Sequence, residues 1–104
     1  MPIVFKKLAY WHIYSLIIII MHLEILTPGS KVFTGEVRLI KVPGSKGSFE
    51  IMNNHAPIIS TLDNGKVKIV TNNDETIFYD IKGGVVQVVK NNIIVLAESL
   101  TKVS

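Results

Sequence analysis

Cysteine is absent from all 104 residues, and its absence excludes two common ways of stabilising a small chain. Neither a disulfide framework nor a thiolate metal site can form without it, and small secreted domains usually depend on one or the other. A chain of this length is expected to fold as one domain with a single core. The missing cysteines therefore favour a reducing, cytoplasmic setting.

Charge is also scarce in this sequence. Charged residues make up 18% of the chain, the formal net charge is +3, and no basic cluster is longer than Lys6-Lys7. Nucleic-acid binding normally needs a basic patch or stripe that neutralises phosphates, so no nucleic-acid partner is predicted. The hydrophobic content of 48% nevertheless predicts a folded chain rather than a disordered one.

Residues 1–20 differ in composition from the rest of the chain. They contain the only tryptophan and two of the three tyrosines, and they end in four consecutive isoleucines. The uncharged run 8–21 is shorter than the roughly 20 residues that a membrane-spanning helix needs, and no typical signal-peptide cleavage site follows it. We interpret residues 1–20 as a hydrophobic extension, either upstream of a true start at Met21 or in contact with a membrane.

From Met21 onward the pattern is one of short strands. Stretches rich in Val, Ile, Thr and Phe are interrupted regularly by turn residues, which is typical of a β-sandwich or barrel. The segment HLEILTP places Leu23 and Ile25 on one face, and GEVRLIKVPG does the same for Val37 and Leu39. No helical spacing and no internal repeat is visible in this part of the sequence. The predicted fold class is all-β.

The second half of the chain predicts two hairpins. The turn TNND joins the strands GKVKIV and TIFYDI, and the strands VVQVVK and IIVLAE flank Asn91-Asn92. Asparagine tolerates the positive φ that a tight two-residue turn requires. Gly83-Gly84, just before the second hairpin, indicates a bulge or a close approach of backbone. The inward positions of the first hairpin are expected to be Val67, Ile69, Ile77, Tyr79 and Ile81.

The loop PGSKGSFEIMNNHAP, residues 43–57, raises the question of a chemical role. A phosphate-binding loop needs the pattern GxxxxGK[ST], with the lysine after the second glycine and a helix following. Here Lys46 precedes Gly47, and a strand follows the loop's first turn. No phosphate site is therefore predicted.

His55 is the candidate general base in this loop. The sequence offers it no nearby nucleophile and no paired acidic group, and His22 and His55 lack the spacing of metal ligands. Asn-His-Ala-Pro is better interpreted as a turn whose side chains bond the local backbone and whose Pro57 stiffens the exit. We predict no catalytic residue, no metal and no cofactor, and hence a binding or scaffolding module.

Three segments together resemble a known family. They are MHLEILTPGSKVFTGEV (21–37), VPGSKGSFEIMNNHAPIISTLDNGKVKI (42–69) and IKGGVVQVVKNNIIVLAE (81–98). Their distinctive features are Phe33-x-Gly35, the GxxG ahead of NHAP, and the hairpin from Gly83-Gly84 to Ala97-Glu98. In this combination the chain resembles the N-terminal domain of the epsilon subunit of the rotary F-type ATP synthase.

The resemblance implies a sandwich of two five-stranded sheets over residues 21–104, without catalytic activity. It implies a place in the rotor at the foot of the central stalk, against the gamma subunit and the c-ring. Such a subunit is peripheral to the membrane through its complex, on the cytoplasmic face of the inner (plasma) membrane. Residues 43–57 are then expected to face these partners. The interface residues implied are Gly44, Ser45, Lys46, Gly47, Glu50, Asn54, His55, Ala56, Pro57 and Ile58.

Many members of this family continue into a C-terminal helical hairpin that can inhibit ATP hydrolysis and, in some, bind ATP. This sequence ends at Ser104, so neither property is expected here. The alternative from another class is an exported β-sandwich binding module anchored by residues 1–20. The absent cleavage site, the absent cysteines and the length of the family resemblance count against that alternative.

Overall fold

The computed structural model describes residues 21–103. The predicted extension at residues 1–20 lies outside them. The described chain forms nine β-strands and no helix, which confirms the all-β prediction. The strands are β1 (Met21–Thr27), β2 (Ser30–Val42), β3 (Phe49–Ile51), β4 (Ile58–Leu62), β5 (Gly65–Thr71), β6 (Thr76–Ile81), β7 (Gly84–Val89), β8 (Asn92–Ala97) and β9 (Leu100–Lys102).

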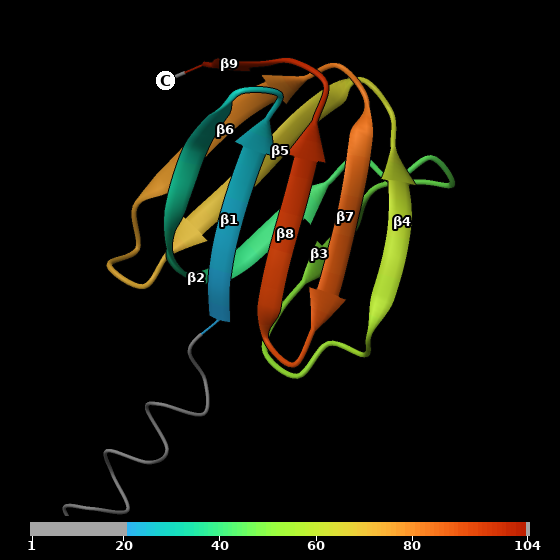
Figure 1. The fold of residues 1–104 in the computed structure, drawn as a ribbon. Coiled ribbons are helices and arrows are strands. Elements are labelled where there is room, and N and C mark those ends of the chain that lie inside the picture. Colours follow the sequence, from blue (N-terminus) through green and yellow to red (C-terminus); the bar gives the residue numbers. More distant parts are fainter. Residues whose placement is uncertain (1–20, 104) are drawn as a thin grey trace, which may run out of the picture.

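The strands form two facing layers, which we call layer one and layer two (Figure 1). Layer one has the order β4-β7-β8-β1-β2, and layer two has the order β3-β2-β5-β6-β9. Strand β2 belongs to both, because it pairs with β1 through residues 30–37 and with β5 and β3 through residues 37–42. Counting β2 in each layer gives five strands per layer, as the predicted sandwich requires.

Strand β2 passes from one layer to the other at an irregularity in its pairing. Its register with β5 shifts between Val37 and Leu39. Val37 and Ile40 are fully buried, whereas Leu39 is only partly buried. A bulge leaves one residue unpaired and bends the strand, so strict alternation does not continue through it. The prediction that Leu39 shares the inner face with Val37 was therefore wrong, and Ile40 takes that place.

The first predicted hairpin is confirmed as β5 and β6. Val67 pairs with Tyr79, and Ile69 pairs with Ile77 across the two strands. The turn between them is closed by the N–H of Asp74, which donates to the carbonyl oxygen of Thr71 at 3.0 Å. All five inward positions expected for this hairpin are buried or partly buried.

The second hairpin, β7 and β8, is present, but its turn lies one residue earlier than predicted. Val88 pairs with Ile93, and both side chains face the core, which leaves Lys90 and Asn91 as the turn. Their φ angles are 49° and 62°, as a tight turn with two positive-φ residues requires. The burial of the Val88–Ile93 pair fixes how β7 and β8 are aligned, and this alignment leaves Asn92 in β8. The prediction that Asn91-Asn92 form the turn was therefore wrong.

Gly84, at the start of β7, confirms the predicted close approach of backbone. Its φ is +153°, and a Cβ added there would collide with the carbonyl oxygen of Leu96 on β8. The backbone conformation of Gly84 and the lack of room for a side chain beside Leu96 therefore both require glycine at this position.

The core lies between the layers and is built from both inner faces. Leu23 and Ile25 of β1 and Val67 and Ile69 of β5 are fully buried, as the sequence alternation predicts. Burying one such side chain stabilises the fold by about 1.5–3 kcal/mol relative to leaving it in water. No buried polar or charged residue was found among the residues described. The sandwich is therefore held together by aliphatic packing.

Candidate partner-binding surface

The structure divides the predicted interface loop into two turns in different places. Residues 43–48 turn beside the last residues of β4, where Gly44 forms a bridge with Leu62. Residues 52–57 turn beside the β7–β8 hairpin, and β3 lies between the two turns. The ten predicted residues thus do not form a single loop surface.

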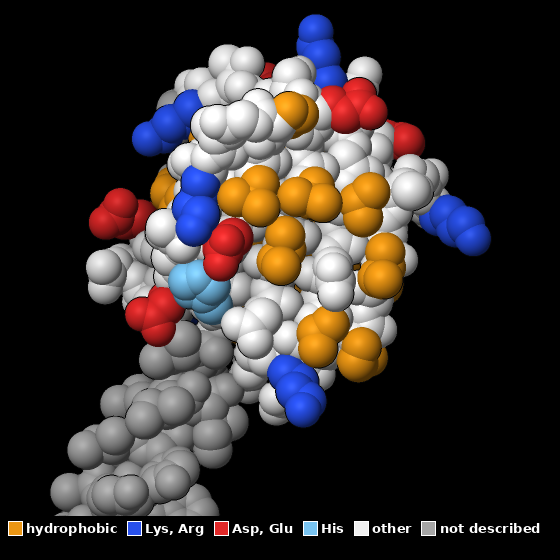
Figure 2. Space-filling model, viewed as in Figure 1, with side chains coloured by type: hydrophobic (Ala, Val, Ile, Leu, Met, Phe, Trp, Pro, Cys, Tyr) orange, Lys and Arg blue, Asp and Glu red, His pale blue; other side chains and the backbone are white. Residues whose placement is uncertain are grey.

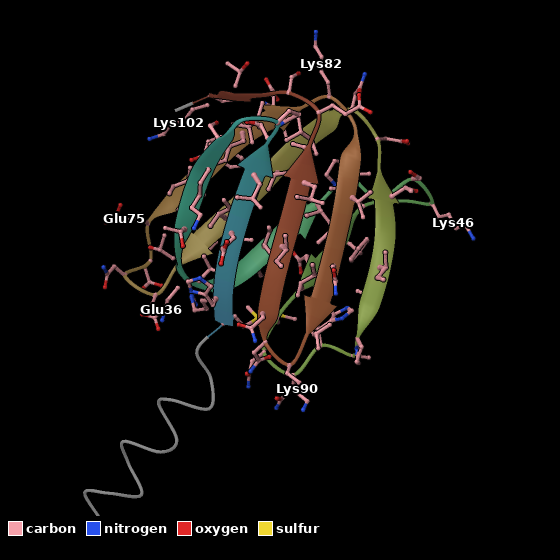
Figure 3. All side chains as sticks on the ribbon, in the orientation of Figure 1. Glu36, Lys46, Glu75, Lys82, Lys90 and Lys102 are labelled. Carbon is pink, nitrogen blue, oxygen red and sulfur yellow. The ribbon has the colours of Figure 1, made fainter. Side chains whose placement is uncertain are left out.

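The first turn is fixed by short backbone hydrogen bonds and by small residues. The N–H of Gly47 donates to the carbonyl oxygen of Gly44 at 2.9 Å, and the N–H of Ser45 donates to that of Thr61 at 3.0 Å. A Cβ on Gly44 would lie 2.8 Å from the ring of Phe49, so a larger residue does not fit. Lys46, at the tip, is exposed and points away from the body of the protein (Figure 3).

A shallow groove of about 640 Å³ lies between this turn and β4. Phe49 and Ile58 provide apolar lining, and the hydroxyl of Thr61 donates to the hydroxyl oxygen of Ser45 at 2.8 Å across it. Among the described residues, Lys46 is the only charged one that lines it. The groove contains no pair of groups suited to acid–base chemistry.

The second turn carries His55. The backbone N–H of His55 donates to the carbonyl oxygen of Met52 at 3.1 Å, and its ring Nδ1 lies 2.8 Å from the carbonyl oxygen of Ala56, to which Nδ1–H can donate. Asn54 has a φ of 65°, a conformation that asparagine tolerates better than most residues. The contact of the His55 ring with the carbonyl oxygen of Ala56 confirms that a side chain of the Asn-His-Ala-Pro turn bonds the local backbone.

Glu50 and Ile58 lie on strands rather than in the two turns. Glu50 is exposed on β3 and pairs with Lys41 of β2, so its side chain lies on the outer face of layer two. Ile58 is partly buried and packs against the core. Ile58 therefore contributes to the fold as well as to the edge of layer one.

Layer one also has an apolar patch on its outer face, which the sequence analysis did not identify (Figure 2). Leu96 of β8 lies between Leu26 of β1 and Val85 of β7, and the next row holds Ile94 and Ile59 on either side of β7. Leu96 is 50% exposed and Ile59 is 73% exposed. We call Leu26, Ile59, Val85, Ile94 and Leu96 the outer apolar patch.

Polar side chains border the outer apolar patch on the side of β1 and β2. Glu24 lies 3.6 Å from His22 Nε2 and 3.6 Å from Lys31 Nζ. An exposed ion pair such as Glu24–Lys31 adds little to stability. An apolar centre with a polar, solvent-accessible rim is the usual composition of a protein–protein interface.

The sequence of β8 already contained the signal for this patch. The strand is NIIVLA, and every outward position after Asn92 is apolar. A strand with one solvated face normally alternates apolar and polar residues, whereas an unbroken apolar run indicates that both faces are covered. The run in β8 could have identified a second covered face.

The described residues offer little for catalysis or metal binding. No group of three or more His, Cys, Asp or Glu side chains comes together anywhere in residues 21–103. Residues 21–103 contain no helix long and apolar enough to cross a membrane. The features that stand out are the two turns and the outer apolar patch, all of which are surfaces.

A family model for the ATP synthase delta/epsilon chain, β-sandwich domain, matches residues 20–103. The chain belongs to this family. It is 37% identical over 78 residues to the ATP synthase epsilon chain of Caulobacter vibrioides, covering 75% of this chain and 90% of the relative. It is also 37% identical over 79 residues to the epsilon chain of Chlorobium limicola, covering 76% and 90%.

Two solved structures share the fold. One is the mitochondrial ATP synthase of Euglena gracilis, described as OSCP, F1 and c-ring, with a TM-score of 0.77 and 14% identity. The match covers 81% of this chain and 54% of that chain. The other is the central stalk and c-ring of the Tetrahymena thermophila mitochondrial ATP synthase, with a TM-score of 0.66, 20% identity and coverage of 78% and 65%.

Family membership settles two expectations of the sequence analysis. The resemblance to the epsilon subunit is confirmed, and so is the expectation that the chain is not an enzyme, because the epsilon chain is a non-catalytic subunit of ATP synthase. As an ATP synthase subunit, the chain is a component of a membrane-associated complex.

Proposed function

We propose that this protein is a central-stalk subunit of the F1Fo ATP synthase rotor, where it binds the gamma subunit and the c-ring. By joining the ring to the stalk it would help to couple ion flow to ATP synthesis. It would lie peripherally on the cytoplasmic face of the inner (plasma) membrane, held there by the complex. The family match over residues 20–103 is the observation that carries this proposal.

The outer apolar patch is the surface best suited to the gamma subunit. Contiguous apolar side chains at the centre of layer one are costly in water unless a partner covers them. The charged residues beside the patch, Glu24 and Lys31, supply the polar rim that a specific interface needs. With gamma bound at the outer apolar patch, the proposed interface extends from the loop at 43–57 to the outer face of layer one.

Eight of the ten residues named from the sequence stay in the proposal, in two separate groups. Asn54, His55, Ala56 and Pro57 belong to the turn beside the β7–β8 hairpin, where they line a hollow together with Lys90 and Asn91. We assign this end of layer one to the c-ring. Gly44, Ser45, Lys46 and Gly47 form a secondary contact at the edge beside β4.

Reconstitution with purified subunits tests the proposal. The full chain, immobilised through an affinity tag, should retain purified gamma subunit with c-ring, and an unrelated β-sandwich protein carrying the same tag should not. In cells, the chain should co-purify with the membrane-bound synthase. Failure to retain gamma and c-ring, together with recovery of the chain outside the cytoplasm, would contradict the proposal and support an exported binding module.

A further inference from the structure

Two segments far apart in the sequence meet at one end of layer one. The turn at residues 52–57 leads into β4, and the turn at Lys90 and Asn91 joins β7 to β8. Residues from both turns line the same shallow hollow of about 390 Å³. This end of the molecule is therefore built from two turns rather than one.

Asn91 joins the two turns through its side chain. Its Oδ1 accepts a hydrogen bond from the backbone N–H of Asn54 at 2.9 Å, and its Nδ2 donates to Oδ1 of Asn53 at 2.8 Å. Its own φ is 62°, so it also supplies one of the two positive-φ positions of the hairpin turn. One residue thus shapes the hairpin turn and holds the neighbouring turn against it.

The surface held by Asn91 has a definite chemistry. Lys90 and His55 line the hollow, together with Asn54, Ala56 and Pro57, and no carboxylate is among its lining residues. Lys90 is exposed at this end, and its ammonium group can donate three hydrogen bonds. Such a surface fits a partner segment that presents carboxylate or carbonyl oxygens.

We infer that residues 53–57 and the hairpin turn at 90–91 form one composite contact surface for an acidic, oxygen-rich loop of the partner, with Asn91 as its positioning residue. Asn91 acts by fixing the backbone of Asn54 relative to Lys90. The inference rests on the proposed function for the identity of the partner, which is the gamma and c-ring assembly. The geometry of Asn91 does not depend on that identity.

Amide exchange in the full chain, followed by NMR, tests the positioning role. Asn91→Gly keeps the positive φ but removes the side-chain hydrogen bonds to Asn53 and Asn54, so exchange at the Asn54 amide should rise about threefold to tenfold. Asn91→Asp keeps an oxygen acceptor for that amide and should leave its exchange near the parent value. The Asp74 amide, in the distant β5–β6 turn, is the internal control. Unchanged exchange at Asn54 in Asn91→Gly would overturn the positioning role.

Binding of purified gamma with c-ring tests the composite surface. Lys90→Gln is compared with Lys82→Gln, since Figure 3 shows these two lysines at opposite ends of the sandwich. Lys90→Gln and Asn91→Gly should each weaken binding about threefold to tenfold at low salt, and the loss in Lys90→Gln should shrink at high salt. Lys82→Gln should bind like the parent.

The outcomes separate this inference from the proposed function. If the parent chain binds and Asn91→Gly and Lys90→Gln bind equally well, the composite surface is wrong while the proposed function stands. If the parent chain does not bind, the proposed function and the partner named here both fall. Melting temperatures of all four variants close to the parent value would show that lost binding does not reflect unfolding.

Discussion

The outer faces of the two layers differ in chemistry, although their inner faces are alike. On layer one, Leu26, Leu96 and Val85 lie side by side across β1, β8 and β7, and Ile94 and Ile59 lie on either side of Gln87 in the next row. On layer two, Lys41 lies between Glu50 of β3 and Lys68 of β5, and Lys66 is opposite Asp80 of β6. One outer face thus resembles an interface, and the other resembles an ordinary solvated surface.

This difference shows which features belong to folding and which belong to binding. A sandwich needs apolar residues only on the two faces that meet. Layer two largely follows that rule, with Lys41, Glu50, Lys66 and Asp80 outside, although Leu39 and Phe78 also lie on its outer face. Layer one departs from it at the outer apolar patch, where folding gains little from leucine or isoleucine. The departure therefore indicates a covering partner.

The largest expected effect is a loss of stability on truncating core side chains. It should be similar for the inner faces of the two layers. Leu23→Ala in layer one and Ile69→Ala in layer two each empty a fully buried position and should lower the free energy of unfolding by about 2–5 kcal/mol. Urea denaturation measures both. The control Ile59→Ala, on the outer face, should cost within about 0.5 kcal/mol. A much smaller loss in one layer than in the other would break the equivalence.

The next effect separates the outer faces. Leu96→Lys places a charge in the outer apolar patch and should weaken binding to gamma and c-ring by at least about 2 kcal/mol. Thr101→Lys places the same charge on layer two, opposite Asp80, and should leave binding unchanged. Pull-down measures the difference, with thermal melts as the check on folding. Equal loss in both variants would mean that the patch has no special role.

A smaller effect concerns pH and the inner face of layer two. Burial raises the pKa of Tyr79 above its ordinary value of 10.0. The folded chain therefore holds this proton more tightly than the unfolded chain, so stability should fall as pH rises above 10.0. Urea denaturation of the parent and of Tyr79→Phe should show a steeper decline for the parent. Identical slopes in the two proteins would exclude a contribution from Tyr79.

The smallest effect concerns the two charged residues named from the loop. Glu50 lies on the outer face of layer two, so Glu50→Ala should leave partner binding unchanged. Lys46→Ala removes a charge at the edge of layer one and should weaken binding modestly, by about 0.5 kcal/mol or less, and less at high salt. Titration of gamma and c-ring with each variant at two salt concentrations distinguishes the two expected results. A larger loss in Glu50→Ala would place the interface on layer two.

Much of the fold could be predicted from alternation alone. Leu23, Ile25, Val67 and Ile69 occupy the expected inner positions because a strand with one covered face repeats every two residues. Leu39 did not follow, because the bulge in β2 changes the phase of the pattern within a single strand. The bulge arises in the pairing of β2 with β5, and the alternation of residues within β2 does not predict that pairing.

The surface could be predicted only in part. The turn character of the segment at 53–57 follows from its asparagines and proline, and the structure confirms it. The contact between Asn91 and Asn54 depends on how two segments meet in space, which one sequence does not reveal. The outer apolar patch likewise depends on pairing between four strands, although the run in β8 indicated it.

The most direct test of the central claim is labelling of single cysteines in the assembled complex. The chain has no cysteine of its own, so Gln87→Cys, between Ile94 and Ile59 on layer one, and Thr101→Cys on layer two each introduce one thiol. Reaction with a maleimide is timed for the free chain and for the chain bound to gamma and c-ring. Binding should slow labelling at position 87 by about tenfold or more and leave labelling at position 101 unchanged. Equal labelling rates at position 87 in the free and bound chain would contradict the account.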